Sequence, residues 1–275
     1  MGKCNRSGTN AVKEKSLLYD IGKRIVRWMD GMVNLTVFVL FLMLAAYGCY
    51  AIWDSNQIYS EADKKQYETY KPEGDNSESF AELQKLNPEV IAWLTIYGTN
   101  IDYPVAQTDD NQKYVNVNAK GEFSLAGSLF MDYRNTSDFS DFCNIIYGHH
   151  MEKKAMFGEL ENFTEETFFK EHRYGSLYVN GREKELEFAA ILKDDAYNNV
   201  IYNPTIGQEE KKQEFLTYIK LHAMHSNDME LSENDQILLL STCTPEGTNG
   251  RFILVAKIDN EMNAGKGEKE DGKKK

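Results

Sequence analysis

The stretch Gln236-Ile-Leu-Leu-Leu-Ser-Thr-Cys243, Thr244-Pro-Glu-Gly-Thr-Asn-Gly250, Arg251-Phe-Ile-Leu-Val-Ala-Lys-Ile258 decides the fold of this chain. It contains an apolar segment that ends in a cysteine, a seven-residue loop, and a second apolar segment that begins with an arginine. The pattern predicts a β-hairpin, in which neighbouring strands lie about 5 Å apart. We therefore expect the Cys243 thiol and the Arg251 guanidinium to face each other at the mouth of the loop.

A thiol beside an arginine points to acyl transfer. An arginine side chain is permanently cationic and only donates hydrogen bonds, so it suits a developing oxyanion and not the role of a base. A base stands upstream, where the short apolar segment Asn144-Ile-Ile-Tyr-Gly-His-His150 ends in two histidines. If the strand continues, His150 alternates to the face opposite His149, so the two histidines have different surroundings.

These motifs resemble those of the sortases, and specifically of class B, the cysteine transpeptidases of Gram-positive bacteria. The sortase consensus around the cysteine is Thr-Leu-x-Thr-Cys, and the chain departs from it only at Leu239, where the consensus has threonine. The resemblance extends from Ser79 to Asp259. It includes three further segments: Ala92-Trp-Leu-Thr-Ile96, Gly98-Thr-Asn-Ile-Asp-Tyr-Pro-Val105 and Ala126-Gly-Ser-Leu-Phe-Met-Asp-Tyr-Arg-Asn135.

The resemblance implies a catalytic set of His149, Cys243 and Arg251. It also implies that the backbone N–H of Thr244 helps Arg251 to hold the oxyanion. Further substrate-binding residues follow from their places in the family. They are Asn111 and Val115 beside the groove, Val200 and Ile201 as an apolar wall, and Ser241, Thr242 and Thr244 around the cysteine.

The function implied by the resemblance is the cleavage of a C-terminal sorting signal after threonine. The signal would be Asn-Pro-x-Thr-Asn or similar to Leu-Pro-x-Thr-Gly, and the acyl group would pass through a thioester to an amine of a peptidoglycan precursor. The partners would then be surface proteins that carry the signal, with no cofactor and no metal. Two alternatives stay open: a membrane-anchored cysteine endopeptidase or hydrolase, and a non-catalytic surface scaffold.

The fold predicted for residues 79–259 is mainly β. Many short strands with a few inserted helices indicate a closed β-barrel, and class B sortases resemble this with an N-terminal helix and a helix between strands six and seven. We expect the first helix over Ser79–Leu86 and the second over Glu209–Met224, which has one apolar side. Asn180-Gly181 is typical of a tight hairpin turn. A largely helical connection is expected over Met156–Phe169.

An apolar run, Met32–Trp53, is long enough to span a bilayer, which takes about 20 residues. The preceding residues 1–31 hold seven basic and three acidic residues, a balance of +4. The whole chain carries −12, so the remainder carries −16. The positive-inside rule therefore predicts an uncleaved anchor with a cytoplasmic N-terminus and an extracellular catalytic domain. A cleaved signal peptide is the rival interpretation.

The remaining segments complete the expected organisation. Residues 54–78 are polar and predict a stalk, and 260–275 are charged and predict a disordered tail. Four cysteines do not form a disulfide framework, since Cys4 and Cys49 fall inside the cell and in the membrane. Cys143 is expected to be a small core residue. The acidic exterior argues against nucleic acid as a partner.

Overall fold

A computed structural model of the chain describes residues 7–245 and 249–259. The predicted tail at 260–275 lies outside the described residues. The chain divides into two units, residues 1–57 and 58–275. The first consists of most of the long helix α1 (Ser7–Glu61), which contains an 18-residue window of mean hydropathy 2.2 and could cross a membrane by length and composition.

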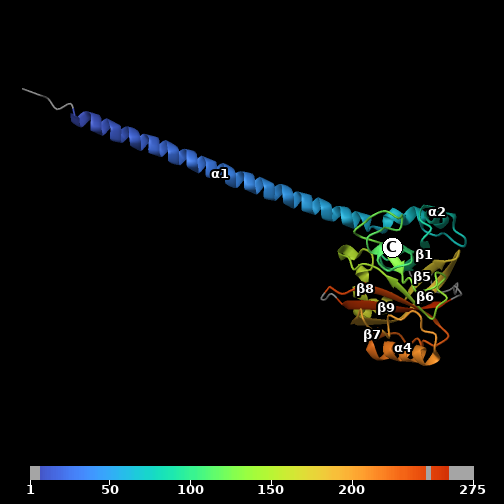
Figure 1. The fold of residues 1–275 in the computed structure, drawn as a ribbon. Coiled ribbons are helices and arrows are strands. Elements are labelled where there is room, and N and C mark those ends of the chain that lie inside the picture. Colours follow the sequence, from blue (N-terminus) through green and yellow to red (C-terminus); the bar gives the residue numbers. More distant parts are fainter. Residues whose placement is uncertain (1–6, 246–248, 260–275) are drawn as a thin grey trace, which may run out of the picture. The chain divides into compact units, whose positions relative to one another are not determined.

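The second unit is built around a closed β-barrel. Its strands follow the order β5-β1-β2-β3-β4-β8-β9-β6, and β5 pairs with β6 to close the ring. A ninth strand, β7, pairs with β6 alongside the barrel. The closed β-barrel predicted from the sequence pattern is therefore confirmed, and it has eight strands (Figure 1). The strands are β1 (Val90–Ile96), β2 (Asp102–Ala106), β3 (Leu129–Met131), β4 (Cys143–Tyr147), β5 (Tyr174–Val179), β6 (Arg182–Asp195), β7 (Ala223–Ser226), β8 (Gln236–Cys243) and β9 (Gly250–Asp259).

Two hairpins follow their turn chemistry. Asn180 and Gly181 both have positive φ, 53° and 75°, as the turn between β5 and β6 requires. Gly98, at φ 79°, turns the chain between β1 and β2. The Asn180-Gly181 turn lies where the sequence predicted it, because asparagine and glycine tolerate the left-handed conformation at low cost.

The helices of the second unit lie outside the barrel wall. The predicted N-terminal helix is α2 (Glu78–Leu86), capped by the Ser77 hydroxyl. The predicted connection, Met156–Phe169, contains the 3₁₀ segment η4 (Gly158–Thr164) and most of α3 (Glu166–Glu171), and a further 3₁₀ segment, η3 (Glu152–Lys154), precedes it. The amphipathic helix is α4 (Glu209–His222), between β6 and β7, and it ends two residues earlier than expected because Ala223 already begins β7.

The predicted stalk at 54–78 needs correction. Residues 54–61 continue α1, and the 3₁₀ segment η1 (Lys64–Tyr70) follows it. Ala62 and Tyr67 are buried in the main core, so the compact unit begins well before Ser79. Polar composition suggested a linker, but the few apolar side chains of this segment are the ones that pack.

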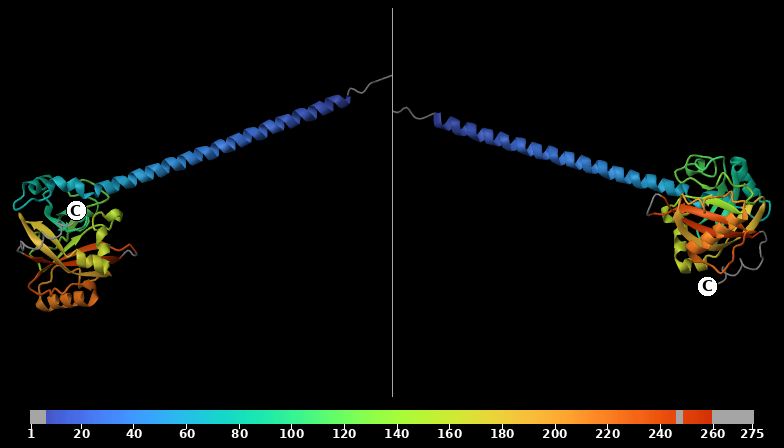
Figure 2. Two further views of the ribbon diagram at one scale, coloured as in Figure 1. Left: turned by 180° about the vertical axis from the view of Figure 1, so that it is seen from behind. Right: turned by 60° about the horizontal axis from the view of Figure 1, so that its bottom comes forward.

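The core lies on both sides of the barrel wall. Leu238 and Leu240 point into the main cluster inside the barrel, whereas Ile237 and Leu239 pack in a second cluster with Phe215 of α4. This explains why β8 is apolar at four successive positions, 237–240, since a strand covered on both faces loses the polar alternation. The two views in Figure 2 agree that α4, drawn in orange, covers one side of the strands.

Candidate active site

The predicted hairpin is present, and it places Cys243 directly opposite Arg251. The two residues end the β8–β9 register, and side chains opposite each other in an antiparallel pair lie on the same face with Cβ atoms about 5 Å apart. Cys243 is exposed, although it follows six buried residues of β8. The strand thus carries its thiol from the core to the surface at the point where the arginine side chain begins.

A parallel pairing brings His149 to the same place. β4 runs beside β8 with Tyr147 opposite Ser241, and two hydrogen bonds extend the alignment beyond the strand end. Gly148 N donates to Ser241 O at 3.2 Å, and Thr242 Oγ1 donates to Gly148 O at 2.8 Å. Continuing the register by one more residue sets His149 beside Cys243.

Packing favours glycine at position 148. A Cβ atom there would lie 2.5 Å from Leu129 Cδ2 and 2.7 Å from Phe157 Cδ2, so those two side chains would have to shift to admit it. The chain thus passes close to the barrel wall just before the histidine. The Gly-His pair is therefore a local structural unit as well as a motif.

The two histidines have different surroundings. His149 is partly buried, and its Nε2 lies 2.8 Å from the Val115 carbonyl oxygen. A carbonyl oxygen only accepts, so Nε2 carries the hydrogen and Nδ1 is the other, exchangeable nitrogen. His150 instead lies 3.2 Å from the Glu161 carboxylate, through Nε2.

The predicted oxyanion donor at Thr244 already has a partner. The backbone N–H of Thr244 donates to Gly250 O at 2.9 Å, closing the first pair of the loop. It is therefore occupied in this structure and not directed at an incoming carbonyl. The same Gly250 oxygen accepts from Arg251 Nη1, also at 2.9 Å, which holds the guanidinium near the mouth of the hairpin.

Two tyrosines that were not predicted as site residues support the cysteine strand. The Tyr202 hydroxyl and Ser241 Oγ share a hydrogen bond at 2.8 Å. Tyr147 stacks on Tyr202 and donates to the fully buried Asp132 at 2.9 Å. Although burial opposes ionisation, hydrogen bonds from Arg134 and Tyr147 keep the pKa of Asp132 below its usual range.

The Tyr202 phenol lies within electrostatic reach of both Arg251 and Cys243. Burial raises the pKa of Tyr202, while the bond with Ser241 and the charge of Arg251 oppose that shift. The phenol is thus neutral at physiological pH and close to the catalytic set. Tyr202 directly follows the predicted residues Val200 and Ile201 in the sequence. Only its tertiary contact with Ser241 indicates that it supports the site.

The other predicted substrate-binding residues fall into two groups. Asn111 is partly buried and spans two partners, donating to Asp132 Oδ2 at 3.1 Å and accepting from Tyr133 N at 3.0 Å. Val115 lies at the end of η2 (Lys113–Val115), beside His149. Ser241 and Thr242 are buried, and their hydroxyls are engaged with Tyr202 and Gly148.

The apolar wall expected from residues 200 and 201 is only half present. Val200 is half-buried, but Ile201 is fully buried in the cluster beneath α4. Ile201 therefore offers no exposed surface to a substrate in this structure, which corrects its expected role. It supports the loop from inside.

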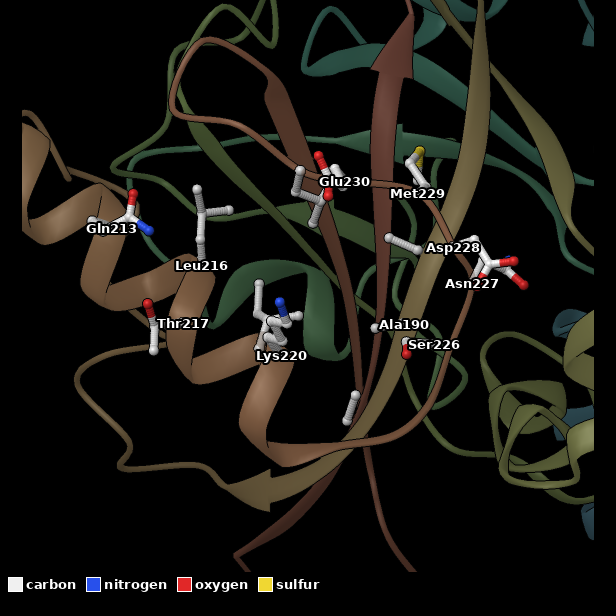
Figure 3. Close-up of a pocket in the computed structure, with 14 residues that line it drawn as sticks. Ala190, Gln213, Leu216, Thr217, Lys220, Ser226, Asn227, Asp228, Met229 and Glu230 are labelled. Carbon is white, nitrogen blue, oxygen red and sulfur yellow. The ribbon is translucent and has the colours of Figure 1, made fainter.

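A hollow elsewhere in the unit contains none of the predicted site residues. It has a volume of about 420 Å³ and lies between α4 and the segment 226–231 (Figure 3). Leu216 and Lys220 of α4 line one side, and Ser226, Asp228 and Met229 line the other. Cys243 instead lies at an exposed strand end.

Comparison with known proteins relates the second unit to one family. Residues 94–259 match the model of the Sortase domain. "Sortase B" of Listeria monocytogenes is 33% identical over 210 residues, which cover 74% of this chain and 82% of that protein. "Sortase B" of Staphylococcus aureus is 30% identical over 181 residues, covering 65% and 74% respectively.

Solved structures agree with the sequence matches. A sortase B from the type II pilus of Streptococcus pneumoniae is 47% identical, with a TM-score of 0.58 over 66% of this chain and 99% of that chain. A sortase B from B. anthracis is 30% identical, with a TM-score of 0.66 over 76% and 98%. These solved structures therefore resemble the second unit in both fold and sequence.

Proposed function

This chain belongs to the sortase family, its relatives are class B cysteine transpeptidases, and we propose that it cleaves a C-terminal sorting signal through a thioester on Cys243. The signal is of the Asn-Pro-x-Thr-Asn or Leu-Pro-x-Thr-Gly type, and the acyl group passes to an amine of a cell-wall precursor. The observation that carries the proposal is the meeting of three strand ends. β4, β8 and β9 bring His149, Cys243 and Arg251 together at one rim of the barrel.

The first half of the reaction forms the thioester. The Cys243 proton passes to His149, and the thiolate attacks the carbonyl carbon of the signal's threonine. The resulting oxyanion accepts hydrogen bonds from the Arg251 guanidinium, since the Thr244 N–H is already used within the hairpin. The C–N bond then breaks, and the departing amine takes the proton from His149.

The second half transfers the acyl group. An incoming amine attacks the thioester and gives up a proton to His149, the C–S bond breaks, and the protein is left on a new amide. Cys243 recovers its proton from the histidine. If water takes the place of the amine, the same steps make the enzyme a hydrolase, which is the alternative left open by the sequence.

Anchoring in a membrane is part of the proposal. The apolar window of α1 supports it, and the +4 balance of residues 1–31 favours a cytoplasmic N-terminus with an extracellular barrel. Detection of the N-terminus by an impermeant label only after cell lysis would support this orientation. Labelling on intact cells would overturn it.

A second acceptor is favoured by one comparison. The relative at 47% identity is described as a sortase B from a pilus, and a further class B sortase of Streptococcus pyogenes, described as involved in pilus biogenesis, is 37% identical. A pilus enzyme joins protein subunits, so the acceptor amine would belong to another surface protein. The chemistry at Cys243 is the same in both cases.

One assay separates these possibilities. The full chain in detergent is incubated with a panel of sorting peptides, either alone, with a peptidoglycan-type peptide amine, or with a lysine-containing surface-protein subunit. A transpeptidase forms a new amide product with one of the two amines, and the preferred amine identifies the acceptor. Cleavage that yields only the free acid, whichever amine is added, would contradict transfer and favour a hydrolase.

A further inference from the structure

The orienting partner of His149 is a main-chain group. In many Cys–His and Ser–His sites a carboxylate or amide side chain orients the imidazole. Here the Val115 carbonyl oxygen accepts from Nε2 at 2.8 Å. The hydrogen bond made by one ring nitrogen decides which nitrogen is free to exchange a proton. The position of a single carbonyl therefore determines how His149 can act.

The segment that carries this carbonyl is firmly held. Tyr114 is buried, and its hydroxyl donates to Glu89 at 2.6 Å and accepts from Asn87 at 2.8 Å. The Asp110 carboxylate accepts from the backbone N–H groups of Gln112 and Lys113, which fixes the start of η2. The turn that ends at Val115 is thus anchored at both its side chain and its backbone.

Gly127 sets how closely the chain approaches this turn. Its φ is +62°, and a Cβ atom there would lie 2.6 Å from the carbonyl oxygens of both Tyr114 and Val115. Its neighbour Ser128 donates its backbone N–H to Tyr114 O at 3.0 Å, so the two segments are in direct contact. Any side chain at position 127 must displace the carbonyl that His149 uses.

We propose that Gly127 is a positioning residue that holds the Val115 carbonyl against His149 Nε2, so that Nδ1 exchanges the proton with Cys243. The carbonyl takes the place of the carboxylate or amide side chain that orients the imidazole in other Cys–His and Ser–His sites. The catalytic meaning of this arrangement rests on the proposed function. The arrangement itself is a property of the ring and is measurable without any substrate.

The chain offers a matched control for the test. Gly121 also has a left-handed backbone, at φ +86°, but no atom lies within 4 Å of where its Cβ would be. Alanine at either position costs the same kind of backbone strain, about 1 kcal/mol. Only Gly127→Ala presses on Val115. A difference between the two variants therefore reports the displaced carbonyl and not the strain.

The experiment uses the full chain in detergent with histidine-selective ¹⁵N labelling. The chain has five histidines, and the His149 ring is assigned from its absence in His149→Ala. At a pH where the ring is neutral, the nitrogen shifts should show the Nε2–H tautomer in the wild-type protein and in Gly121→Ala. Gly127→Ala should lose this signature and, because a misplacement of about 1 Å costs roughly 100-fold, lose kcat on that scale. Gly121→Ala should keep activity close to that of the wild type.

Three results would overturn the proposal. They are an Nδ1–H tautomer in the wild-type ring, unchanged activity in Gly127→Ala, and a loss of activity with the His149 signature intact. If Gly127→Ala does not fold, the wild-type spectrum alone decides. An enzyme that acts on no sorting peptide would refute the proposed function while leaving the tautomer readable, so the two failures are distinguishable.

Discussion

Two cysteines lie on neighbouring parallel strands of the barrel, Cys143 at the start of β4 and Cys243 at the end of β8. Cys143 is fully buried, and burial together with the charges of Asp132 and Asp141 raises the pKa of its thiol. Cys243 is exposed and opposite Arg251, and His149 follows the end of the neighbouring strand β4. The same side chain on adjacent strands is thus a core residue at one rim and a candidate nucleophile at the other.

The difference teaches that position along the strand, and not residue type, decides the chemistry. A thiolate is the reactive form, and an apolar interior disfavours it, whereas a nearby cation and base favour it. The predictions below test each part of this contrast.

The largest expected effect is on the nucleophile itself. Cys243→Ala should reduce cleavage and transfer by at least about 10⁴-fold, because the loss of a nucleophile removes the covalent route. Cys143→Ala should retain most activity, since its thiol takes no part in the reaction. Steady-state rates of sorting-peptide cleavage measure the activity. Circular dichroism of both variants checks that they fold. Residual turnover above a few percent of wild type in pure Cys243→Ala would remove it from the role.

The second effect concerns the base. His149→Ala should lose about 10²- to 10⁴-fold, the usual contribution of a general acid–base. His150→Ala is the matched control, because its ring pairs with Glu161 instead. It should stay close to wild type in the same peptide assay. A larger loss in His150→Ala than in His149→Ala would mean that the wrong histidine was chosen.

The third effect concerns the oxyanion. Arg251→Ala should lose about 100- to 1000-fold in kcat, the typical cost of one oxyanion donor. Arg251→Lys keeps the charge but not the planar fork, so a substantial loss should remain. Alkylation of Cys243 by a small reagent should persist in both variants. A lysine variant that matches the wild-type kcat would show that charge alone suffices. A fully active alanine variant would exclude Arg251 as an oxyanion donor.

The smallest effect is on stability at alkaline pH, and it belongs to Cys143. Its folded pKa is raised, so the unfolded thiol ionises from about pH 8.5 while the folded thiol keeps its proton. The stabilisation is complete below about pH 8.5 and falls as pH rises, by up to about 1.4 kcal/mol per unit.

Denaturant unfolding of the full chain between about pH 8.5 and 9.5 measures this slope, and the difference from Cys143→Ala isolates the thiol, because the tyrosines, with an ordinary pKa near 10, contribute equally in both proteins. Cys143→Ala should flatten it and leave the dependence between about pH 6 and 8 unchanged, because the thiol is protonated there in both states. An identical slope in both proteins would mean that Cys143 is not shielded as the fold implies.

The sequence predicted much of the local structure and less of the long-range structure. The Cys243–Arg251 pair was predictable because a short loop joins its strands, and the Asn180-Gly181 turn because few residues adopt its backbone. The placement of His149 depends on β4 pairing in parallel with β8, about 94 residues later, and no local pattern specifies that pairing. Only the family resemblance pointed to it.

Main-chain contacts and burial explain the remaining misses. The Thr244 N–H looked free because a sequence does not show that the Gly250 carbonyl closes the loop. The Val115 carbonyl has no signature at all, since any residue supplies the same group. Ile201 was expected at the surface, but α4 folds back over its loop and buries it.

The most direct test of the contrast between the two cysteines is to map the acyl group. The full chain is incubated with a sorting peptide in the absence of an amine acceptor, quenched in acid, digested and analysed by mass spectrometry. We predict that the peptide containing Cys243 carries the N-terminal part of the signal up to threonine, and that hydroxylamine releases it. An adduct on Cys143, or rapid cleavage with no trapped adduct on Cys243, would contradict the account.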